Sequence, residues 1–441
     1  MFPSLTQMVN PKRQAMRGAG RVALLLALGV PTVEAQVPGD SLRLGDLLGR
    51  VEAQDPRARQ RALQADLSWL RLGDVCAQWR PQVTFGAEAV AQSEVPEINV
   101  PVPGVEIPSP PHLRLQATAD AQQLLYDGGR TRAQTALEMA RRAEAEAGVG
   151  VALFPLRLAV VEAFYTARLA DAQAALLRLH AADLDARRTL ARSRAADGAA
   201  LRADGAALDA EWLRAGQRIA EAEAGRRAAL AVLADLTGQP LPPNTPLARA
   251  DDALFNVDTT LAARPELALF EARRARAGKE ADVAAHATRP QISAIGQLGL
   301  GRPGLAMFED RMHPYGFVGL RARWNPLDWG TVQRAREAAR LQQDLVETER
   351  EAFERAIRRD VEDERATLER LEQALADDSA IVAARTEVAR VARRQFEEGT
   401  LLAADYAQRL NALYDALATR ALHETQRSHA RARLLVTLGQ L

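Results

Sequence analysis

Two turn sequences decide the fold: Leu125-Tyr126-Asp127-Gly128-Gly129 and Asn325-Pro326-Leu327-Asp328-Trp329-Gly330. Before each turn, apolar and polar residues alternate as they do in strands, and after each turn a helical pattern continues for 68 residues. A chain that leaves a strand must redirect into a helix within these few positions, and Gly128, Gly129 and Gly330 permit the backbone dihedrals required. Asp127 and Asp328 are placed to cap the two helix starts. The sequence therefore contains the same strand-to-helix transition twice.

The repetition extends over most of the chain. Four short motifs recur in the same order, and the pairs are Arg80-Pro81-Gln82 with Arg289-Pro290-Gln291, Leu125-Tyr126-Asp127-Gly128 with Leu327-Asp328-Trp329-Gly330, Asp197-Gly198 with Glu398-Gly399, and Leu236-Thr237-Gly238-Gln239 with Thr437-Leu438-Gly439-Gln440. Their offsets are 209, 202, 201 and 201 residues, and a shorter loop in the second hairpin explains the one large change. Four matches in order indicate a tandem duplication. We expect a first repeat over 42–239, a linker with four prolines over 240–258, and a second repeat over 259–441.

Each repeat opens with a pair of strand-like segments, predicted as hairpins over 82–124 and 291–324. Over 113–121, Leu or Ala occupies every second position, and Arg, Gln, Thr and Asp occupy the positions between. Segments of about ten residues with one apolar and one polar face are typical of transmembrane barrel strands. A soluble sheet packed on a core shows the same alternation. The irregular loop over 91–112, which contains six prolines, suits an extracellular barrel loop better than a tight soluble hairpin.

The segments after the turns predict long antiparallel helical hairpins. Each repeat is expected to have a leading, a long and a return helix, which gives helices over 42–79, 130–197, 200–238, 259–287, 331–398 and 401–439. A continuous helix of 68 residues extends about 100 Å. In the second long helix, seven apolar residues from Phe353 to Val382 step by threes, fours and sevens, which indicates a coiled-coil seam. Gly198 and Gly399 end the two long helices, and Pro155 is expected to kink the first one.

The N-terminus has the pattern of a cleaved export signal over 1–35. A basic leader precedes the apolar run 22–30, and the small-residue site Val33-Glu34-Ala35 follows. Nine apolar residues are too few for a membrane-spanning helix, which needs about 20, and we expect no later segment to be long and apolar enough for one. An exported chain without such a helix can span a membrane only as a β-barrel. The predicted fold class is an α+β membrane protein with four barrel strands per chain and long helical hairpins.

Composition argues against several other functions. The formal net charge is zero, with 57 Lys plus Arg against 57 Asp plus Glu, which argues against nucleic-acid binding. Cys76 is the only cysteine, so neither an intrachain disulfide nor a cysteine zinc site can form. The six histidines lack the helical spacing that puts two ligands on one face, and we expect them at the surface, with His313 in a loop. No phosphate-binding loop or nucleophile elbow is present, so we expect no enzymatic activity, cofactor or metal.

The chain resembles the TolC family of outer-membrane efflux proteins over about residues 42–441. The Arg-Pro-Gln motifs, the two turns and the helix-tip glycines carry the resemblance, and their order and spacing make it specific. It implies a homotrimer in which three chains of four strands form one twelve-stranded barrel, continued by the helices as a tunnel across the periplasm. It also implies a passive duct embedded in outer-membrane lipid, with a periplasmic adaptor and an inner-membrane pump as partners. The sequence supports an oligomer independently, because four strands leave two edges that lipid cannot satisfy and closed barrels need about eight strands.

The resemblance also assigns roles at the helix tips. In the family the tips dock the partner proteins and close the duct, which points to Gly198, Gly399 and Thr400 for docking. An aspartate follows the tip glycine by six residues in the family, and here Asp204 and Asp405 stand at that distance. The alternative is that both aspartates are ordinary solvated helix residues in a chain rich in charge.

Four residues are candidates for the gate. They are Asp405, Asp204, Gln408 and Phe396. Three copies of Asp405 would form a ring of carboxylates that favours cations, and Phe396 fits an aromatic position of the family. The family's second acid and its arginine are replaced here by Gln408 and Leu401, so the polar links that lock its closed state are partly missing.

Two other functions stay open at this point. A periplasmic adaptor is also rich in helical hairpins, but it would have one hairpin inserted between small β-domains. A soluble coiled-coil scaffold would have the helices, with incidental strands.

Overall fold

The computed structural model describes residues 41–95, 110–198, 201–248, 264–304 and 311–441. The predicted export signal lies outside the described residues, as do parts of the proline-rich loop, of the first helix tip and of the linker.

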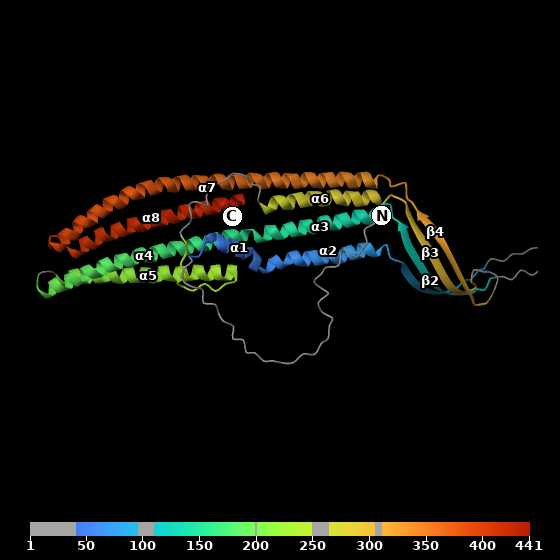
Figure 1. Cartoon of the computed structure of the whole chain (residues 1–441), viewed down its shortest axis with the longest axis horizontal. Coiled ribbons are helices and arrows are strands. Elements are labelled where there is room, and N and C mark those ends of the chain that lie inside the picture. Colours follow the sequence, from blue (N-terminus) through green and yellow to red (C-terminus); the bar gives the residue numbers. More distant parts are fainter. Residues whose placement is uncertain (1–40, 96–109, 199–200, 249–263, 305–310) are drawn as a thin grey trace, which may run out of the picture. The chain divides into compact units, whose positions relative to one another are not determined.

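The described chain consists of long helices and a four-stranded sheet, shown in Figure 1. In chain order the elements are α1 (Leu44–Gln54), η3 (Pro56–Ala58), α2 (Arg59–Ala77), β1 (Gln82–Ala91), β2 (Leu113–Tyr126), α3 (Arg130–Leu153), α4 (Pro155–Ala196), α5 (Arg202–Thr237), α6 (Pro265–His286), β3 (Gln291–Arg302), β4 (His313–Arg323), α7 (Thr331–Glu397) and α8 (Ala403–Leu438). The sequence of a leading helix, two strands, a long helical segment and a return helix thus occurs twice. His313 begins β4, so its predicted place in a loop is wrong.

The two long helices differ in continuity. The segment expected as one helix over 130–197 is two helices, because α3 ends at Leu153 and α4 begins at Pro155. Proline has no amide proton, and its ring collides with the preceding turn, so an unbroken hydrogen-bond ladder cannot pass through Pro155. The counterpart α7 runs for 67 residues without a break.

The sheet joins the two repeats. Its order is β1-β2-β3-β4, every pair is antiparallel, and the central pair links β2 of the first repeat to β3 of the second. Adjacent rows across the sheet alternate in character, with Phe85, Ala119, Leu298 and Gly316 in one row and Thr84, Asp120, Gln297 and Phe317 in the next. One face is therefore mainly apolar and the other mainly polar, as the period-two pattern predicts.

Helix packing supplies the buried core. One cluster joins α1, α4, α5 and α8 and includes Leu47, Phe164 and Leu233, each at most 1% exposed. A second cluster surrounds the ends of the long helices and includes Phe396 and Tyr406. A third, between α7 and α8, buries Ile357 and Val361, which belong to the seam seen in the sequence.

One expectation about the helices is wrong. The span Arg130–Ala196 is long and apolar enough to cross a membrane by length and composition. The helical core explains this character, because Val160, Val161 and Phe164 of this span are buried against α1, α5 and α8. Buried core helices pass the same test, so this span is weak evidence for a membrane helix.

Candidate functional site

The sheet presents an apolar face that no described element covers. Its large side chains are exposed, with Phe85 at 81%, Leu298 at 72%, Val318 at 90% and Leu320 at 74%. Exposed apolar area of this extent on one face marks a surface that meets another apolar phase or a partner.

The opposite face binds its polar groups to one another. Gln297 Nε2 donates to Asp120 Oδ1 over 2.6 Å, and Thr118 Oγ1 donates to Asp120 Oδ2 over 2.9 Å. Gln116 donates to the Tyr315 hydroxyl across the β2–β3–β4 region. These bonds connect both repeats, so the polar face is organised as one surface.

Asp127 holds the turn between β2 and α3. Its carboxylate accepts hydrogen bonds from the amides of Gly129 at 2.8 Å and Thr131 at 2.6 Å, and the residue is 5% exposed. These are amides at the start of α3 that have no partner within the helix. Burial raises the pKa of this carboxyl, but the hydrogen bonds from Thr131 and Gly129 outweigh it, so the pKa lies below its ordinary value.

Asp328 repeats the arrangement before α7. It accepts from the amides of Gly330 and Val332, both at 3.1 Å. These backbone bonds lower the pKa of the Asp328 carboxyl. In the structure, the residue of the second turn that matches Gly128 is Trp329, because both take the left-handed conformation, with φ +66° for Gly128 and φ +50° for Trp329. The two turns therefore align at an offset of 201 residues, one less than the 202 given by the sequence motifs.

Gly128 is required by space as well as by conformation. A Cβ at this position would lie 2.4 Å from Cβ of Arg289, whose guanidinium donates to the Gly128 carbonyl over 3.0 Å. Arg289 belongs to the second Arg-Pro-Gln motif, so this motif packs on the turn of the first repeat. The sequence shows the motif twice but gives no sign of this contact.

The two helix tips have open surroundings. Gly198 and Gly399 have positive φ angles, and a Cβ on either would meet nothing within 4 Å. Thr400 closes the second tip, because its amide and its hydroxyl both donate to the Gln395 carbonyl, at 2.9 and 3.0 Å. The predicted docking positions are therefore accessible backbone turns, and the Thr400 hydroxyl is already bound within the turn.

The structure separates the two tip aspartates. Asp204 Oδ1 accepts a hydrogen bond of 3.2 Å from the amide of Ala403, the first residue of α8, so the first repeat caps a helix of the second. Asp405 is exposed, and its carboxylate has no hydrogen bond or ion pair with any residue in the described ranges. Gln408 is exposed on the same helix and lines a groove of about 570 Å³ between α5 and α8.

Phe396 is part of the core at the tips. It is 5% exposed and stacks on Tyr406 with 5.0 Å between ring centroids. Its carbonyl accepts a hydrogen bond of 2.9 Å from Arg194 of α4, whose guanidinium also donates to the Glu397 carbonyl. Arg194 thus satisfies carbonyls at the C-terminus of α7 and places a positive charge where the helix dipole favours one.

Two ion pairs join the same helices. Arg187 lies 2.6 Å from Glu397, and Arg393 lies 3.1 Å from Asp183. With Arg194 and Asp204 they form what we call the tip latch, the set of polar links from α4 and α5 to α7 and α8. Of these residues, the sequence predicts only Asp204 as a site residue. The available signal was arginine close to a helix C-terminus, which is weak in a chain with 57 basic residues.

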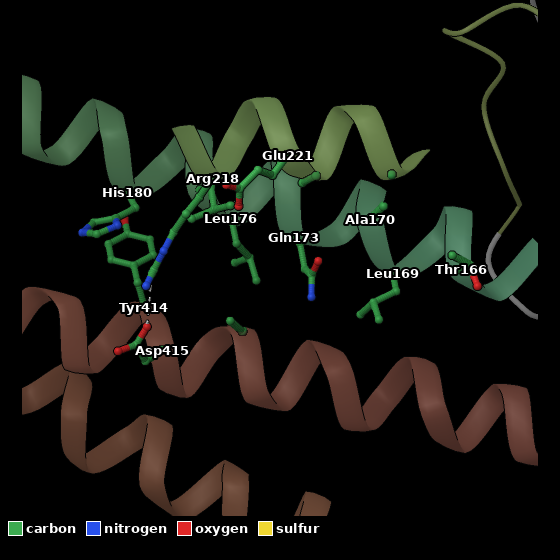
Figure 2. Close-up of a pocket in the computed structure, with 14 residues that line it drawn as sticks. Thr166, Leu169, Ala170, Gln173, Leu176, His180, Arg218, Glu221, Tyr414 and Asp415 are labelled. Atoms are coloured by element: carbon green, nitrogen blue, oxygen red, sulfur yellow. Dashed lines mark ion pairs between the residues drawn. The ribbon is translucent and has the colours of Figure 1, made fainter. Parts of the chain in front are cut away.

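A cavity of about 480 Å³ lies between α4, α5 and α8, shown in Figure 2. His180 stacks on Tyr414 with 4.3 Å between ring centroids, and Arg218 faces Asp415 at 3.9 Å. The surface position expected for His180 is wrong, since it is 6% exposed, and burial lowers its pKa. Burial also raises the pKa of Tyr414 to about 12. None of the predicted gate residues lines this cavity, which belongs to the helical wall.

No metal centre is evident in the part of the chain that the structure describes. Among those residues, no three His, Cys, Asp or Glu side chains gather closely enough to hold an ion.

Comparisons with known proteins agree on one architecture. The structure is similar to the transmembrane channel CusC, with TM-score 0.67 and 15% identity over 90% of this chain and 92% of that one. It is similar to the outer-membrane channel OprN, with TM-score 0.65 and 19% identity over 90% of each chain. It is also similar to the Campylobacter jejuni outer membrane channel CmeC, with TM-score 0.64 and 13% identity over 96% of this chain and 94% of that one. The predicted fold class, strands of a barrel continued by long helical hairpins, is confirmed.

A family model matches part of the sequence. The family model described as outer membrane efflux protein matches residues 256–440, which is the second repeat. A search of curated proteins gave no match. The structural matches extend over both repeats, so the resemblance to the TolC group is confirmed.

Proposed function

We propose that the chain is the outer-membrane channel of a tripartite efflux or secretion system, a passive duct from the periplasm to the outside. The observation that carries the proposal is the sheet. Its apolar face exposes Phe85, Val318 and Leu320, whereas the polar groups of its other face bind one another. Lipid on one side and water on the other account for this distribution.

A closed barrel requires more than one chain. β1 and β4 lie at the edges of the described sheet, and each presents one unpaired row of backbone groups. Lipid cannot satisfy these groups, and closed membrane barrels need about eight strands. Three copies supply twelve strands, and the number three follows from the TolC resemblance. Pairing of β4 with β1 of the next copy removes every edge.

The helices lead from this barrel to the site of partner docking. α7 carries the chain about 100 Å from the turn at Gly330 to the tip at Gly399. An adaptor and an inner-membrane pump are proposed to meet the duct at the tips, where Gly198, Gly399 and Thr400 present open backbone. The tip latch holds the two hairpins of each chain together and sets how readily the narrow end opens.

The two alternative functions fit the structure less well. An adaptor would have one hairpin between small β-domains, but here two helical hairpins each follow a pair of strands. In a soluble scaffold the strands would be incidental, yet their polar groups form bonds between the repeats and their apolar face is uncovered.

Fractionation tests the proposal directly. The protein should be recovered with the outer membrane, and it should migrate differently in gel electrophoresis before and after heating, as closed barrels do. Purified protein should also form water-filled channels in planar lipid bilayers. Recovery as a soluble periplasmic monomer without channel activity would refute the proposal.

A further inference from the structure

The register of the sheet places two arginines of β4 on its polar face. Paired residues lie side by side across the strands, and every second residue along a strand points to the same face. Gln297, whose side chain binds Asp120 on the polar face, pairs with Phe317 of β4. Steps of two residues from Phe317 lead to Arg321 and Arg323, so both arginines lie on the polar face.

Both arginines lie at the end of the sheet nearest the helices. Arg323 is the last residue of β4 and pairs with Gln291, the first residue of β3. Arg321 pairs with Ser293, which is one polar-face row further from the helices. Both arginines are exposed, and neither guanidinium has a hydrogen bond or ion pair with any residue in the described ranges.

No acidic side chain near them offsets these two charges. Besides the arginines, the three polar-face rows nearest the helices consist of the described residues Gln82, Gln122, Leu124, Gln291, Ser293, Ile295 and Gly319, none of which is acidic. The next row contains Asp120, which already accepts hydrogen bonds from Gln297 and Thr118. The turn acids Asp127 and Asp328 bind backbone amides. The helix-side end of the polar face is therefore positively charged.

The surroundings of the two arginines suit an anion. Other arginines of this chain pair with acids, as Arg187 does with Glu397 at 2.6 Å. Beside Arg321, Ser293 Oγ accepts a hydrogen bond of 3.3 Å from Gln122 Nε2, so the Ser293 hydroxyl still has its own proton to donate. Guanidinium groups with neutral donors beside them are a set with which proteins bind carboxylates and phosphates.

We propose that Arg321 and Arg323 form an anion-selective ring at the helix-side mouth of the barrel, and that the duct favours small solutes with carboxylate or phosphate groups. The inference rests on the proposed function, because the polar face lines a water-filled path only if the sheet closes into a barrel. Three copies with two arginines each bring six guanidinium groups to one opening. Rings of arginine or lysine select anions in pores.

The size of the effect follows from screened electrostatics. A barrel of twelve strands has a radius of about 12 Å, so the six charges lie about 10 Å or less from its axis. At 0.1 M salt the Debye length is about 10 Å, and the ring should raise the concentration of a monovalent anion roughly five-fold and lower that of a monovalent cation by a similar factor. At 1 M salt the Debye length is about 3 Å, so the selectivity should nearly vanish.

Reversal potentials in planar lipid bilayers test the ring. In a potassium chloride gradient, Arg321→Gln combined with Arg323→Gln should lower the chloride-to-potassium permeability ratio roughly ten-fold near 0.1 M salt and change it little near 1 M. Each single variant should lower the ratio roughly three-fold, and the single variants carry the test if the double variant does not assemble. The helix tips are the same in all these channels, so any selectivity of the narrow end stays constant.

Two controls separate charge and position from other effects. Arg321→Lys combined with Arg323→Lys keeps the charge and should keep the ratio. Arg114→Gln removes the same charge from the same face at the other end of the sheet, in the row next to Glu88, and should change the ratio less. A polyvalent anion gains more from the ring than chloride does, so inorganic pyrophosphate should block the wild-type channel at a concentration roughly ten-fold or more below that needed for the double Gln variant.

The outcomes distinguish the ring from the duct. Heat-modifiable migration shows whether each variant has formed its barrel. Channels in which the Gln variants have the wild-type permeability ratio at low salt would overturn the ring and leave the duct proposal standing. An equally large change in Arg114→Gln would overturn the position of the ring. Wild-type protein that forms no channels would overturn the proposed function itself.

Discussion

The turn at Asp127 offers the sharpest test of how the strands connect to the helices. The Asp127→Ala substitution removes a carboxylate that binds the amides of Gly129 and Thr131, at 2.8 and 2.6 Å. Asp127 is 5% exposed, so water reaches these amides poorly after the change. We therefore expect the start of α3 to open locally, with the rest of the helix intact.

The magnitude follows from the two bonds. A hydrogen bond to a charged group contributes about 1.5–3 kcal/mol, and loss of a helix cap costs about 0.5–2 kcal/mol. Partial hydration of the freed amides offsets some of this, so a local loss of about 2–3 kcal/mol is expected, or roughly 30- to 150-fold in the opening equilibrium. Asp127→Asn keeps one acceptor oxygen and should lose less.

Hydrogen exchange measured by mass spectrometry on peptides covering 127–135 reports this opening. Protection should fall in Asp127→Ala and stay unchanged in peptides from α8. Asp328→Ala is the matched control, because its two bonds are longer, at 3.1 Å each, and it should show a smaller loss at the start of α7. Wild-type protection over 127–135 in the Ala variant would show that the carboxylate does not hold the turn.

Acidity should mimic the substitution. The Asp127 pKa is lower in the folded chain than its ordinary value of 3.8, since the hydrogen bonds from Thr131 and Gly129 outweigh burial. The carboxylate thus contributes its full stabilisation above about pH 4, and the contribution is lost as the pH falls through the lower, folded pKa. Exchange at the turn of Asp127→Ala should lack this acid-dependent step.

Three further substitutions test the packing. Gly128→Ala should prevent or severely weaken folding, because the new Cβ would lie 2.4 Å from Cβ of Arg289. In Gly198→Ala the new Cβ meets nothing within 4 Å, so the substitution should cost only the strain of the left-handed backbone, about 1–2 kcal/mol. The melting temperature measures both effects. Arg194→Ala removes two bonds to carbonyls of α7 and should raise the open fraction in bilayers, while Arg194→Lys should restore part of the closed state. Phe396→Ala leaves a cavity at a site 5% exposed, and should destabilise the tips by about 3–5 kcal/mol in local hydrogen exchange.

The fold class could be predicted because its signals are periodic. Alternation fixes which side chains share a face of a strand, and no competing element interrupts it, so the apolar and polar rows of the sheet follow directly from the sequence. Glycine and aspartate mark the turns for a local conformational reason, which needs no knowledge of distant contacts. The break at Pro155 has the same local origin.

The contacts at the tips could not be predicted in this way. Arg187 and Glu397 are 210 positions apart, and nothing in a chain with 57 basic and 57 acidic residues singles out this pair. Histidine has no strong preference for the surface or the core, so the sequence does not predict that the packing of α4 on α8 buries His180. The sequence motifs align the turn containing Trp329 with the first turn one residue away from the structural match, because a tryptophan in the left-handed region contradicts its local preference.

The tip latch has consequences for how the duct would open. Within a chain, Asp183 pairs with Arg393 and Arg187 pairs with Glu397. In the proposed ring, pairing of β4 with β1 of the next copy brings the second repeat of one chain to the first repeat of the next. At this junction between copies, the offset of 201 puts Ala384 with Arg192, and Val388 with Ala196, in the places of these pairs. Neither combination can form an ion pair. The two hairpins of one chain are thus held by charges that the junction between copies lacks, so the tips should part between copies and each chain should move as a unit.

Adding the missing pair tests this directly. Val388→Arg combined with Ala196→Glu places an arginine and a glutamate across the junction, in the positions that correspond to Arg187 and Glu397 within a chain and with the same signs. The double variant should lower the open fraction in planar bilayers, with an interaction energy of about 0.2–1 kcal/mol per junction because the sites are near the surface, and high salt should weaken the effect. Each single variant is the control and should not close the channel. If the double variant changes the free energy of channel opening at low salt by the sum of the changes in the single variants, the two positions do not face each other. Opening then does not occur between copies at the tips.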